Sequence, residues 1–387
     1  MNNHHSEAAA PQLAVGLLSY QIGGSEKIGA DLAMSYGRRG YPVFCFALYD
    51  SRGPVRDRLE SAGVECLDLN YLSQPRGVRR RIMYQLQLAR RLRHRRVAAL
   101  HVHHTTALML CGAASRVAGV RSLLMTEHAI HDLEASTGYK RAARFYCRLA
   151  HNVSVVHPGL VEYFRTQIHV PAAHVHYIPN GVAITAASAG DRRVRLRSQF
   201  GANEGEFVFL FAGRLHYTKD LPTLLEAARI AAQTRRFKLW LVGDGAERAD
   251  LEARTNASGL TEVVRFIGEV PDASPYMQAA DGFVMSSATE GLPMVLLEAL
   301  SNRLPCIATA VGGISELLSD GVGLVVPPQN PPQLADAMRR MMDDVGARER
   351  MSTLGAARIA RDFDFERVVD QYLDLLRLPR AWPLSVT

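Results

Sequence analysis

The chain has 387 residues, of which 48% are hydrophobic and 21% charged, and its formal net charge is +7. This length gives room for two domains of ordinary size, and the composition excludes a disordered or a fibrous protein. No run of about 18 apolar residues occurs, so we expect no membrane-spanning helix, and the opening MNNHHSEAAAPQ lacks the basic and apolar regions of a signal peptide.

The cysteines indicate the redox state of the compartment, and the uneven charge indicates which partners the chain could attract. The five cysteines are scattered without CxxC spacing, so we expect neither a disulfide framework nor structural zinc, as in a protein of a reducing cytoplasm. Up to residue 185 there are 22 Lys and Arg against 12 Asp and Glu, a balance of +10, and the remainder has 23 against 26, a balance of −3. Much of the excess lies between Gln74 and Arg96, a segment with nine arginines.

This basic segment has more than one interpretation. It would attract an anionic membrane surface or a charged substrate, and a solvated helix face in an arginine-rich protein would look the same. Nucleic acid is not expected as a partner, because the segment lacks aromatic interleaving and a known binding motif. Arg76–Arg96 is therefore a candidate for contact with an anionic membrane surface.

Strand-like apolar runs alternate with helical segments through the first half of the chain. Strands are expected at residues 13–19, 42–48, 98–103, 122–127 and 152–157, with a further run at 175–182. Helices are expected at residues 25–40, 54–62 and 107–118 and in the basic segment, with a short helix between the strand at 152–157 and the run at 175–182.

A second series of alternating elements begins at residue 207. Its strands are expected at residues 207–215, 237–245, 264–270, 282–287, 305–310 and 323–328. Its helices are expected at residues 220–233, 247–258, 274–280, 294–300 and 332–344, with a last helix after 362–365. Residues 183–197 lose apolar periodicity, which indicates a division after Val182.

The two series predict an α/β protein with two doubly wound parallel sheets, because continuous apolar strands separated by helices are typical of buried parallel strands. We expect a disordered tail at 1–12, a first domain at 13–182, a second at 183–365 and a C-terminal helix within 366–387. Two such domains would face a central cleft. Ligands bind at the carboxyl ends of the strands, where helix amino ends favour phosphate.

Two cations follow the first strand of the second half. In GRLHYTKD, Arg214 and Lys219 lie five residues apart, and an arginine fork with a compact lysine charge suits a diphosphate, although both could be ordinary loop cations. Glycines that allow the backbone to approach a ligand open several turns: Gly23, Gly24, Gly213 and Gly243. No GxGxxG follows the first strand, which argues against a dinucleotide-dependent dehydrogenase.

The stretch SSATEGLPMVLLEAL raises a question of burial. Pro293 suits a first helical position, and residues 294–300 predict a helix with many apolar side chains available for the core. Glu298 lies inside that helix, where a carboxylate is rarely buried unless it is paired. A polar ligand would account for it, and so would exposure on a tilted helix.

Together these motifs resemble the family 4 retaining glycosyltransferases, which have the two-domain GT-B fold. The matching stretches are GGxE at 23–26, GRLHYTKD, LVGDGAE, FIGEV, and E-x7-E from Glu290 to Glu298, followed by ATAVGGISEL. They occur in the family's order over residues 13–375. The resemblance implies two Rossmann-like domains that face a central cleft, the first for the acceptor and the second for the nucleotide sugar. It also implies a C-terminal helix that packs back on the first domain.

The resemblance implies a donor site in the second half. Arg214 and Lys219 would carry the diphosphate, and Glu298 would bind the ribose hydroxyls, a polar partner that makes its burial tolerable. Glu290 would hold the donor sugar, together with the backbone of residues 291–293. The full donor-binding set is Gly23, Gly24, Gly213, Arg214, Lys219, Gly243, Gly268, Val270, Glu290, Gly291, Leu292, Pro293 and Glu298.

Two further roles follow from the same resemblance. The nucleotide base would meet Gly268 and Val270. In LLMTEHAIHD, at a strand end of the first half, a histidine is expected near the reacting sugar, and His128 is a better match than His131. The implied catalytic set is His128, Arg214, Lys219 and Glu290.

No metal or other cofactor is expected. HVHH places His101 and His103 on one face of a strand, but no acidic or cysteine partner is nearby to complete a zinc site. DFD at 362–364 resembles the metal-binding DxD of the other glycosyltransferase fold, yet it follows a helix, and we interpret it as a helix-entry turn. Arg214 and Lys219 could fill the role that a metal plays elsewhere.

The sequence therefore predicts a metal-independent, retaining glycosyltransferase of the cytoplasm or of the inner face of the cell membrane. A UDP- or GDP-linked sugar would be the donor, and a saccharide or lipid-linked saccharide the acceptor, in the synthesis of bacterial surface polysaccharide or glycolipid. Two alternatives stay open. One is a nucleotide-sugar epimerase or hydrolase of the same fold, and the other is a non-catalytic subunit of a polysaccharide assembly complex.

Overall fold

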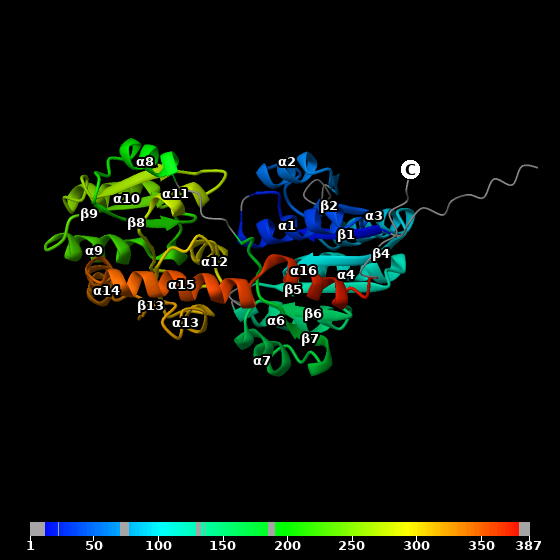
Figure 1. Ribbon diagram of the computed structural model, residues 1–387. Helices are drawn as coiled ribbons and strands as arrows, with labels where there is room; N and C mark the ends of the chain where they lie inside the picture. The colour runs from blue at the N-terminus through cyan, green and yellow to red at the C-terminus, as the bar shows by residue number, and fades with distance from the viewer. Residues whose placement is uncertain are drawn as a thin grey trace, which may run out of the picture. The chain divides into compact units, whose positions relative to one another are not determined.

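The computed structural model describes residues 12–21, 23–69, 77–128, 133–134, 136–184 and 190–378, and the chain forms two compact units (Figure 1). Unit 1 contains the residues up to Pro179 and those from Glu366 onward, and unit 2 runs from Asn180 to Phe365. Each unit has one parallel sheet covered by helices. The prediction of two doubly wound α/β domains is confirmed.

The described part of unit 1 has a seven-stranded parallel sheet in the order β3-β2-β1-β4-β5-β6-β7. The order reverses between β1 and β4, which makes the carboxyl ends of these two strands a topological switch point. The strands are β1 (Gln12–Leu17), β2 (Val43–Ala47), β3 (Glu65–Asp68), β4 (Val97–His103), β5 (Ser122–Glu127), β6 (Asn152–Val155) and β7 (Val175–Tyr177).

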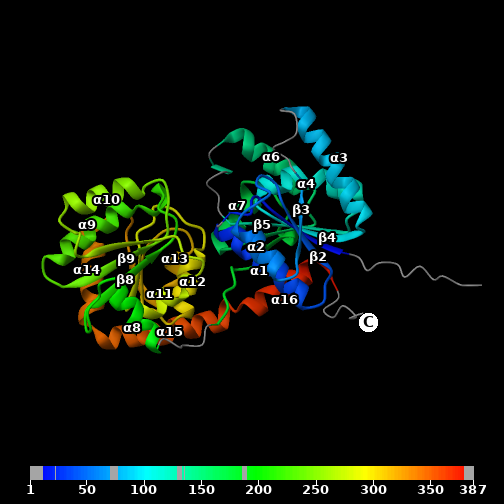
Figure 2. The ribbon, with the colours of Figure 1, turned by 90° about the horizontal axis from the view of Figure 1, so that it is seen from above.

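Helices cover both faces of this sheet. Figure 2 shows α1, α2 and α16 on one side and α3, α4 and α6 on the other, as right-handed crossovers require when the strand order reverses. The helices are α1 (Gly24–Arg38), α2 (Pro54–Ser61), α3 (Val78–His94), α4 (Thr105–Ala118), α6 (Thr137–Cys147), α7 (Pro158–Thr166), the short η2 (Ala172–His174) and α16 (Phe365–Leu375).

The C-terminal helix α16 packs on unit 1. Arg39, at the end of α1, lies 2.6 Å from the Glu366 carboxylate and 2.5 Å from that of Asp370. The ring of Tyr372 is buried and lies 4.9 Å from the ring of His101 on β4. The last segment of the chain thus completes the core of the first unit.

The described part of unit 2 has a six-stranded parallel sheet in the order β10-β9-β8-β11-β12-β13. Its order reverses between β8 and β11. The strands are β8 (Phe207–Ala212), β9 (Phe237–Val242), β10 (Val264–Gly268), β11 (Gly282–Met285), β12 (Cys306–Thr309) and β13 (Gly323–Val326). The helices are α8 (Gly190–Gln199), η3 (Tyr217–Lys219), α9 (Leu221–Ala232), α10 (Arg248–Ala257), α11 (Ser274–Ala279), α12 (Met294–Ser301), α13 (Ile314–Leu317), α14 (Pro331–Asp343) and α15 (Val345–Asp362).

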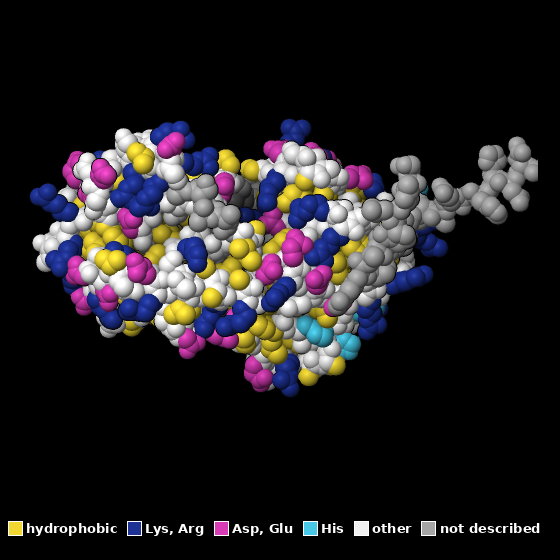
Figure 3. All heavy atoms as spheres, in the orientation of Figure 1, with side chains coloured by type: hydrophobic (Ala, Val, Ile, Leu, Met, Phe, Trp, Pro, Cys, Tyr) yellow, Lys and Arg dark blue, Asp and Glu magenta, His cyan; other side chains and the backbone are white. Residues whose placement is uncertain are grey.

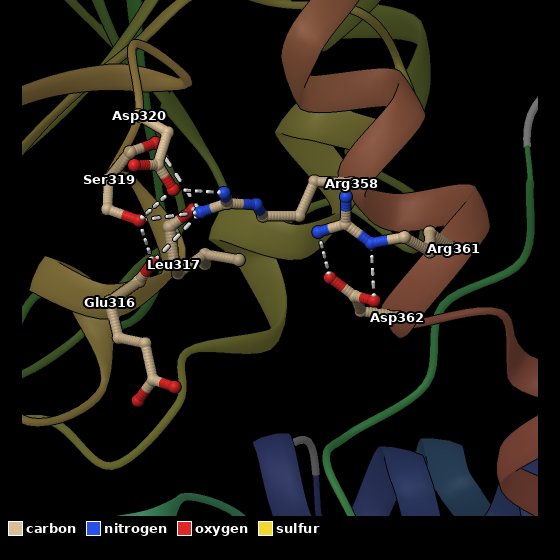
Figure 4. A network of polar contacts seen from close by, with 7 residues as sticks. All are labelled: Glu316, Leu317, Ser319, Asp320, Arg358, Arg361 and Asp362. Atoms are coloured by element: carbon tan, nitrogen blue, oxygen red, sulfur yellow. Dashed lines mark hydrogen bonds and ion pairs between the residues drawn. The ribbon is translucent and has the colours of Figure 1, made fainter.

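Arg358 on α15 fixes the short helix α13 from its carboxyl end (Figure 4). One nitrogen, Nη1, donates to the carbonyl oxygens of Glu316 and Leu317 at 3.0 and 3.1 Å, and to Ser319 Oγ at 2.9 Å. The other, Nη2, donates to the Asp320 carboxylate at 2.8 Å. The orphan carbonyls of a helix end are thereby satisfied by a cation, which the helix dipole also favours.

Several details differ from the sequence-based expectations. The first strand begins at Gln12, within the expected tail, whose remaining residues 1–11 lie outside the described part. The division between units falls after Pro179, where Val182 was expected. The sequence analysis missed the short edge strand β3, and also α6, α8, α13 and α15. Among the described residues, no helix is long and apolar enough to cross a membrane.

Candidate active site

The loops after β8 and β11 meet at the carboxyl edge of the unit 2 sheet. GRLHYTKD follows β8 and ATEGLP follows β11, the two strands between which the order reverses. A hydrogen bond of 2.9 Å from Ala288 N to the carbonyl of Thr218 joins the two loops. Ligands of open α/β sheets bind at such a reversal, so this edge is the candidate site of unit 2.

Glycines let the neighbouring loops of this edge come close together. Gly213 N donates to the carbonyl of Val242 at 2.9 Å, and Gly243 N donates to that of Gly268 at 2.8 Å. Gly243 has φ +128°, and a Cβ there would lie 2.0 Å from the carbonyl oxygen of Gly213. A side chain at position 243 would therefore push the loops apart.

Lys219 and Glu290 form an ion pair between the two loops. Lys219 Nζ contacts Glu290 Oε1, and the Ser287 hydroxyl donates to the same oxygen at 2.8 Å. The side chains are 20% and 12% exposed, so the pair is largely shielded from water. The Ser286 hydroxyl lies 2.9 Å from the carbonyl oxygens of Lys219 and Asp220, which holds the lysine loop against β11.

The Gly-Leu-Pro turn at residues 291–293 is held from two sides. Asn180 is buried, and its Nδ2 donates to the carbonyl of Leu292 at 3.0 Å. Gly312 has φ +54°, and a Cβ there would lie 2.2 Å from the carbonyl oxygen of Glu290. Sequence reasoning missed Asn180, although its position in a Pro-Asn-Gly stretch beside the domain boundary was a signal.

The other predicted donor residues lie along the same edge. The Arg214 side chain is exposed just after Gly213, and Val270 is half-buried after β10. Glu298 is half-buried on α12, the helix that begins at the Gly-Leu-Pro turn. The structure thus brings Lys219 into direct contact with Glu290 and places the other predicted donor residues of unit 2 in neighbouring loops or on α12, whereas Gly23 and Gly24 lie in unit 1. Their contacts with a donor remain predictions.

In unit 1 the loop after β1 leads directly into the amino end of α1. Gly23 is the N-cap residue in an extended conformation, and Gly24 is the first helical residue and exposed. A Cβ at Gly24 would meet none of the described atoms within 4 Å. Packing of the described residues therefore does not require glycine at position 24, which leaves ligand approach as a reason for it.

The buried carboxylate of Glu127 ties His128 to the amino end of α4. Its Oε1 accepts from His128 N and from His104 Nδ1, both at 3.0 Å. Its Oε2 accepts from Thr105 N at 2.9 Å and from Thr105 Oγ1 at 2.6 Å. Burial opposes the charged form, but the hydrogen bonds from His104 and Thr105 outweigh it and lower the pKa of Glu127 to about 2.

His128, which is half-buried, continues a row formed by the buried His101 and His103. His103 Nδ1 lies 3.0 Å from His128 Nε2, and the rings of His101 and His103 stack at 4.5 Å. His101 Nε2 lies 2.7 Å from Thr126 Oγ1. Burial lowers the pKa of His101 to about 3 and holds those of His103 and His128 well below the usual range.

Sequence reasoning selected His128 as a candidate but missed the side chains that hold it. In the sequence, Glu127 is only a carboxylate at the end of a predicted strand, and His104 is only the last residue of HVHH, so neither indicates a contact with His128. His131, the weaker alternative to His128, lies outside the described residues. In the described ranges, no group of three His, Cys, Asp or Glu side chains is arranged to hold a metal ion.

We expect the stability of the protein to fall as the pH drops below about 6.5, because the buried histidines favour the neutral form. An unfolded histidine takes up a proton near pH 6.5, whereas His101 resists it until about pH 3, so the unfolded state binds more protons in between. Each such histidine should remove on the order of 1.5 kcal/mol between pH 6.5 and 5. Urea unfolding from pH 8 to 4.5 measures this slope.

A variant and a control belong to this experiment. His128→Gln removes one of the three groups and should flatten the slope, whereas His169→Gln, at an exposed position, should leave it unchanged. Below about pH 4.5 the stability should fall more steeply, because Glu127 takes up a proton in the unfolded chain but stays charged in the folded protein. A free energy of unfolding that is constant from pH 7 to 5 would contradict the neutral histidine row.

Comparison with known proteins gives two family matches that together span most of the chain. Residues 22–185 match the model described as Glycosyltransferase Family 4, and residues 193–358 match the model described as Glycosyl transferases group 1. The first match covers unit 1 from residue 22 to Pro179 and continues six residues into unit 2. The second match lies wholly within unit 2.

Individual proteins show the same similarity. The chain is 29% identical to an Alpha-D-kanosaminyltransferase of Streptomyces kanamyceticus, over 76% of this chain and 81% of that protein. It is 36% identical to the lipopolysaccharide core biosynthesis glycosyltransferase LpsD of Rhizobium meliloti, over 44% and 49%. A crystal structure of Anabaena Alr3699/HepE with UDP and glucose has a TM-score of 0.84 at 23% identity, over 95% of this chain and 100% of that one. This likeness confirms the predicted GT-B fold.

Proposed function

Since this chain belongs to the family 4 glycosyltransferases, we propose that it transfers a sugar from a nucleoside diphosphate donor to a saccharide or lipid-linked saccharide. We further propose that the anomeric configuration is retained and that no metal takes part. The observation that carries the proposal is the Lys219–Glu290 pair at the switch point of the unit 2 sheet.

The donor diphosphate would bind between Lys219 and Arg214. A lysine ammonium has three N–H donors, so its contact with Glu290 leaves others for phosphate oxygens. Arg214 adds a planar fork suited to a second phosphate group. Glu290 and the Gly-Leu-Pro turn would hold the sugar, and Glu298 the ribose hydroxyls, while Gly268 and Val270 would meet the base.

The reaction would exchange one bond at the anomeric carbon for another. The bond from that carbon to the donor phosphate oxygen breaks, and the acceptor oxygen forms a bond on the same face. The acceptor proton passes to the departing phosphate, so the products are a glycoside and the nucleoside diphosphate. The leaving diphosphate gains charge in the transition state, and the fixed cations Lys219 and Arg214 would stabilise it there.

Unit 1 would contribute the amino end of α1 and His128. Backbone N–H groups at a helix amino end favour a phosphate or a sugar oxygen, and Gly23 with Gly24 leaves them accessible. His128 would contact the reacting sugar. Its backbone is fixed by Glu127 and its ring by His103, so it would meet a ligand in one orientation.

We propose that the acceptor belongs to bacterial surface polysaccharide or glycolipid and is met at the cytoplasmic face of the membrane. The similarity to a lipopolysaccharide core glycosyltransferase supports this class of acceptor. The basic segment Arg76–Arg96 supports contact with an anionic membrane, and all of it except Arg76 lies within the described residues.

A screen of nucleotide sugars tests the proposal. One UDP- or GDP-linked sugar should raise the unfolding temperature, because a ligand at 100 times its Kd stabilises by about 2.7 kcal/mol. Transfer to a saccharide acceptor should then proceed equally with EDTA present. Loss of activity with EDTA and its return with Mn²⁺ or Mg²⁺ would contradict metal independence. Release of free nucleotide without any glycoside product would indicate a hydrolase instead.

A further inference from the structure

Helix α3 has an exposed face with a short apolar stripe. Its buried side packs against α4 and contains Tyr84, Leu88, Ala89 and Leu92. On the opposite side Ile82, Met83 and Leu86 are exposed by 54%, 46% and 51%. Leu86 lies four residues after Ile82 and three after Met83, so the three side chains share one side of the helix. A stripe of this kind at the surface indicates a surface that meets a partner.

The charges of α3 are all of one sign. No Asp or Glu occurs in the sequence between Asp68 and Glu127, whereas cationic and anionic side chains are interspersed over much of the face drawn in Figure 3. Arg79, Arg80 and Arg81 lie at the amino end of α3, where the helix dipole disfavours cations. Their position does not help the helix itself, and it concentrates positive charge at this end of α3.

A neighbouring helix adds an exposed aromatic side chain. The Arg81 guanidinium lies 5.6 Å from the ring centroid of Tyr146 on α6, so the two helices approach each other there. Next to it, Phe145 is 60% exposed. Arg141 is exposed four residues before Phe145 and therefore lies on the same side of α6, and Arg148 is exposed just after the carboxyl end of that helix.

Three arginines and a histidine line an open hollow at the carboxyl end of α3. They are Arg90, Arg91, His94 and Arg95, and the hollow has a volume of about 340 Å³. Arg95 is held by the Glu65 carboxylate at 2.6 and 2.7 Å and lies 4.9 Å from the ring centroid of Phe44. Within the described ranges, the other three have no hydrogen-bond or ion-pair partner.

The hollow has the chemistry of a phosphate site. Arg90 and Arg91 are neighbouring cations at the end of α3, and neither has a carboxylate partner among the described residues, whereas Arg95 is paired with Glu65. Arginine forks match phosphate oxygens in pairs. The fork of Arg95 is occupied by Glu65, so Arg90 and Arg91 are the forks left to meet an anion. A phosphate monoester carries about −1.5 to −2 charges near pH 7, more than the single charge of a diester.

We propose that this hollow binds the phosphate monoester of a lipid headgroup in an anionic bilayer, while Ile82, Met83 and Leu86 enter the boundary between headgroups and acyl chains. The inference rests on the proposed contact with a membrane and goes beyond it by assigning a site and a ligand class. Amphipathic helices with arginines beside apolar residues bind bilayers in this way.

Vesicle sedimentation tests the site. Phosphatidylcholine vesicles with phosphatidate, a monoester, are compared with phosphatidylcholine vesicles containing phosphatidylglycerol, a diester, at matched zeta potential. The wild-type protein should bind both at low salt and should prefer phosphatidate by about tenfold, as expected for additional charge-assisted hydrogen bonds. Higher salt should release it from both.

Two variants that lose the same charge distinguish a specific phosphate site from non-specific electrostatic attraction to the vesicle. Arg90→Gln with Arg91→Gln, and the control Arg79→Gln with Arg80→Gln, each remove two arginines from α3. Both should weaken attachment, by about fivefold for each charge. Only the first should also abolish the preference for phosphatidate. Donor-induced thermal stabilisation should be unchanged in both, because these residues lie outside the proposed donor site.

Three results would overturn the proposal. A preference for phosphatidate that survives in Arg90→Gln with Arg91→Gln would mean that the arginines act only as diffuse charge. Saturable binding of inorganic phosphate, lost in that variant but without any vesicle preference, would identify a free anion as the ligand. Failure of the wild-type protein to sediment with either vesicle would exclude the membrane. Even in that case, the proposed glycosyltransferase function would be supported if a nucleotide sugar stabilised the protein.

Discussion

Alanine in place of Lys219 is expected to lower turnover at least about 100-fold, and Arg214→Ala should do the same, because each removes a cation from the departing diphosphate. Initial rates with the donor identified by stabilisation measure the effect. Arg254→Ala is the matched control, since Arg254 pairs with Asp250 on the surface of the same unit. Full activity in Lys219→Ala or in Arg214→Ala would contradict the diphosphate assignment of that residue.

Lys219→Ala also leaves Glu290 without its ion-pair partner, so a second variant is needed to interpret it. Binding of free nucleoside diphosphate is the suitable measurement, because Glu290 is expected to contact the sugar. If Lys219 touches the diphosphate, Lys219→Ala with Glu290→Gln should bind the nucleotide as weakly as Lys219→Ala alone. If Lys219 only neutralises Glu290, the double variant should bind it as the wild-type protein does.

The two glutamates of E-x7-E should separate nucleotide binding from sugar transfer. Glu298→Ala should weaken binding of free UDP or GDP at least about tenfold, as expected when a charged hydrogen-bond partner of the ribose is lost. Glu290→Ala should leave that binding intact and reduce turnover instead. Isothermal titration with the nucleotide and initial rates with the nucleotide sugar distinguish the two.

The control for this pair is Glu252→Ala, which removes a carboxylate from an ion pair with Arg248 on the surface of α10. It should change neither measurement. Wild-type nucleotide binding by both Glu290→Ala and Glu298→Ala would show that Glu298 does not hold the ribose. Weaker nucleotide binding in Glu290→Ala would place that residue at the nucleotide instead.

The strands that were predicted correctly are those whose apolar runs are continuous. β5 and β8 are buried on both faces, and a strand between two helical layers can only be apolar throughout. β3 was missed because it is a four-residue edge strand with exposed Glu65 and Asp68 at its ends. α15 was missed because it buries only Met351, Gly355 and Ile359 and so has no broad apolar face, and its place depends on anchors such as Arg358.

The spacing of the motifs predicted which loops contain the candidate residues, but not which of these residues touch each other. GRLHYTKD and E-x7-E each follow a strand, and in a parallel sheet all strand ends of one kind lie at one edge. That Lys219 contacts Glu290, 71 residues away, depends on β8 lying beside β11 and on Ser286 holding the lysine loop. No local pattern contains that contact.

The sequence by itself determined the family, the two parallel sheets and the edge of each sheet at which ligands are expected, because these follow from local periodicity and from motifs within single loops. Only the tertiary structure decided the partners of the charged groups. Glu127 is charged in the core because His104 and Thr105, more than twenty residues earlier, donate to it, and Arg90 and Arg91 line one hollow with Arg95. Hydrogen bonds and ion pairs act over a few ångströms, and distances of that kind between remote residues are set by packing.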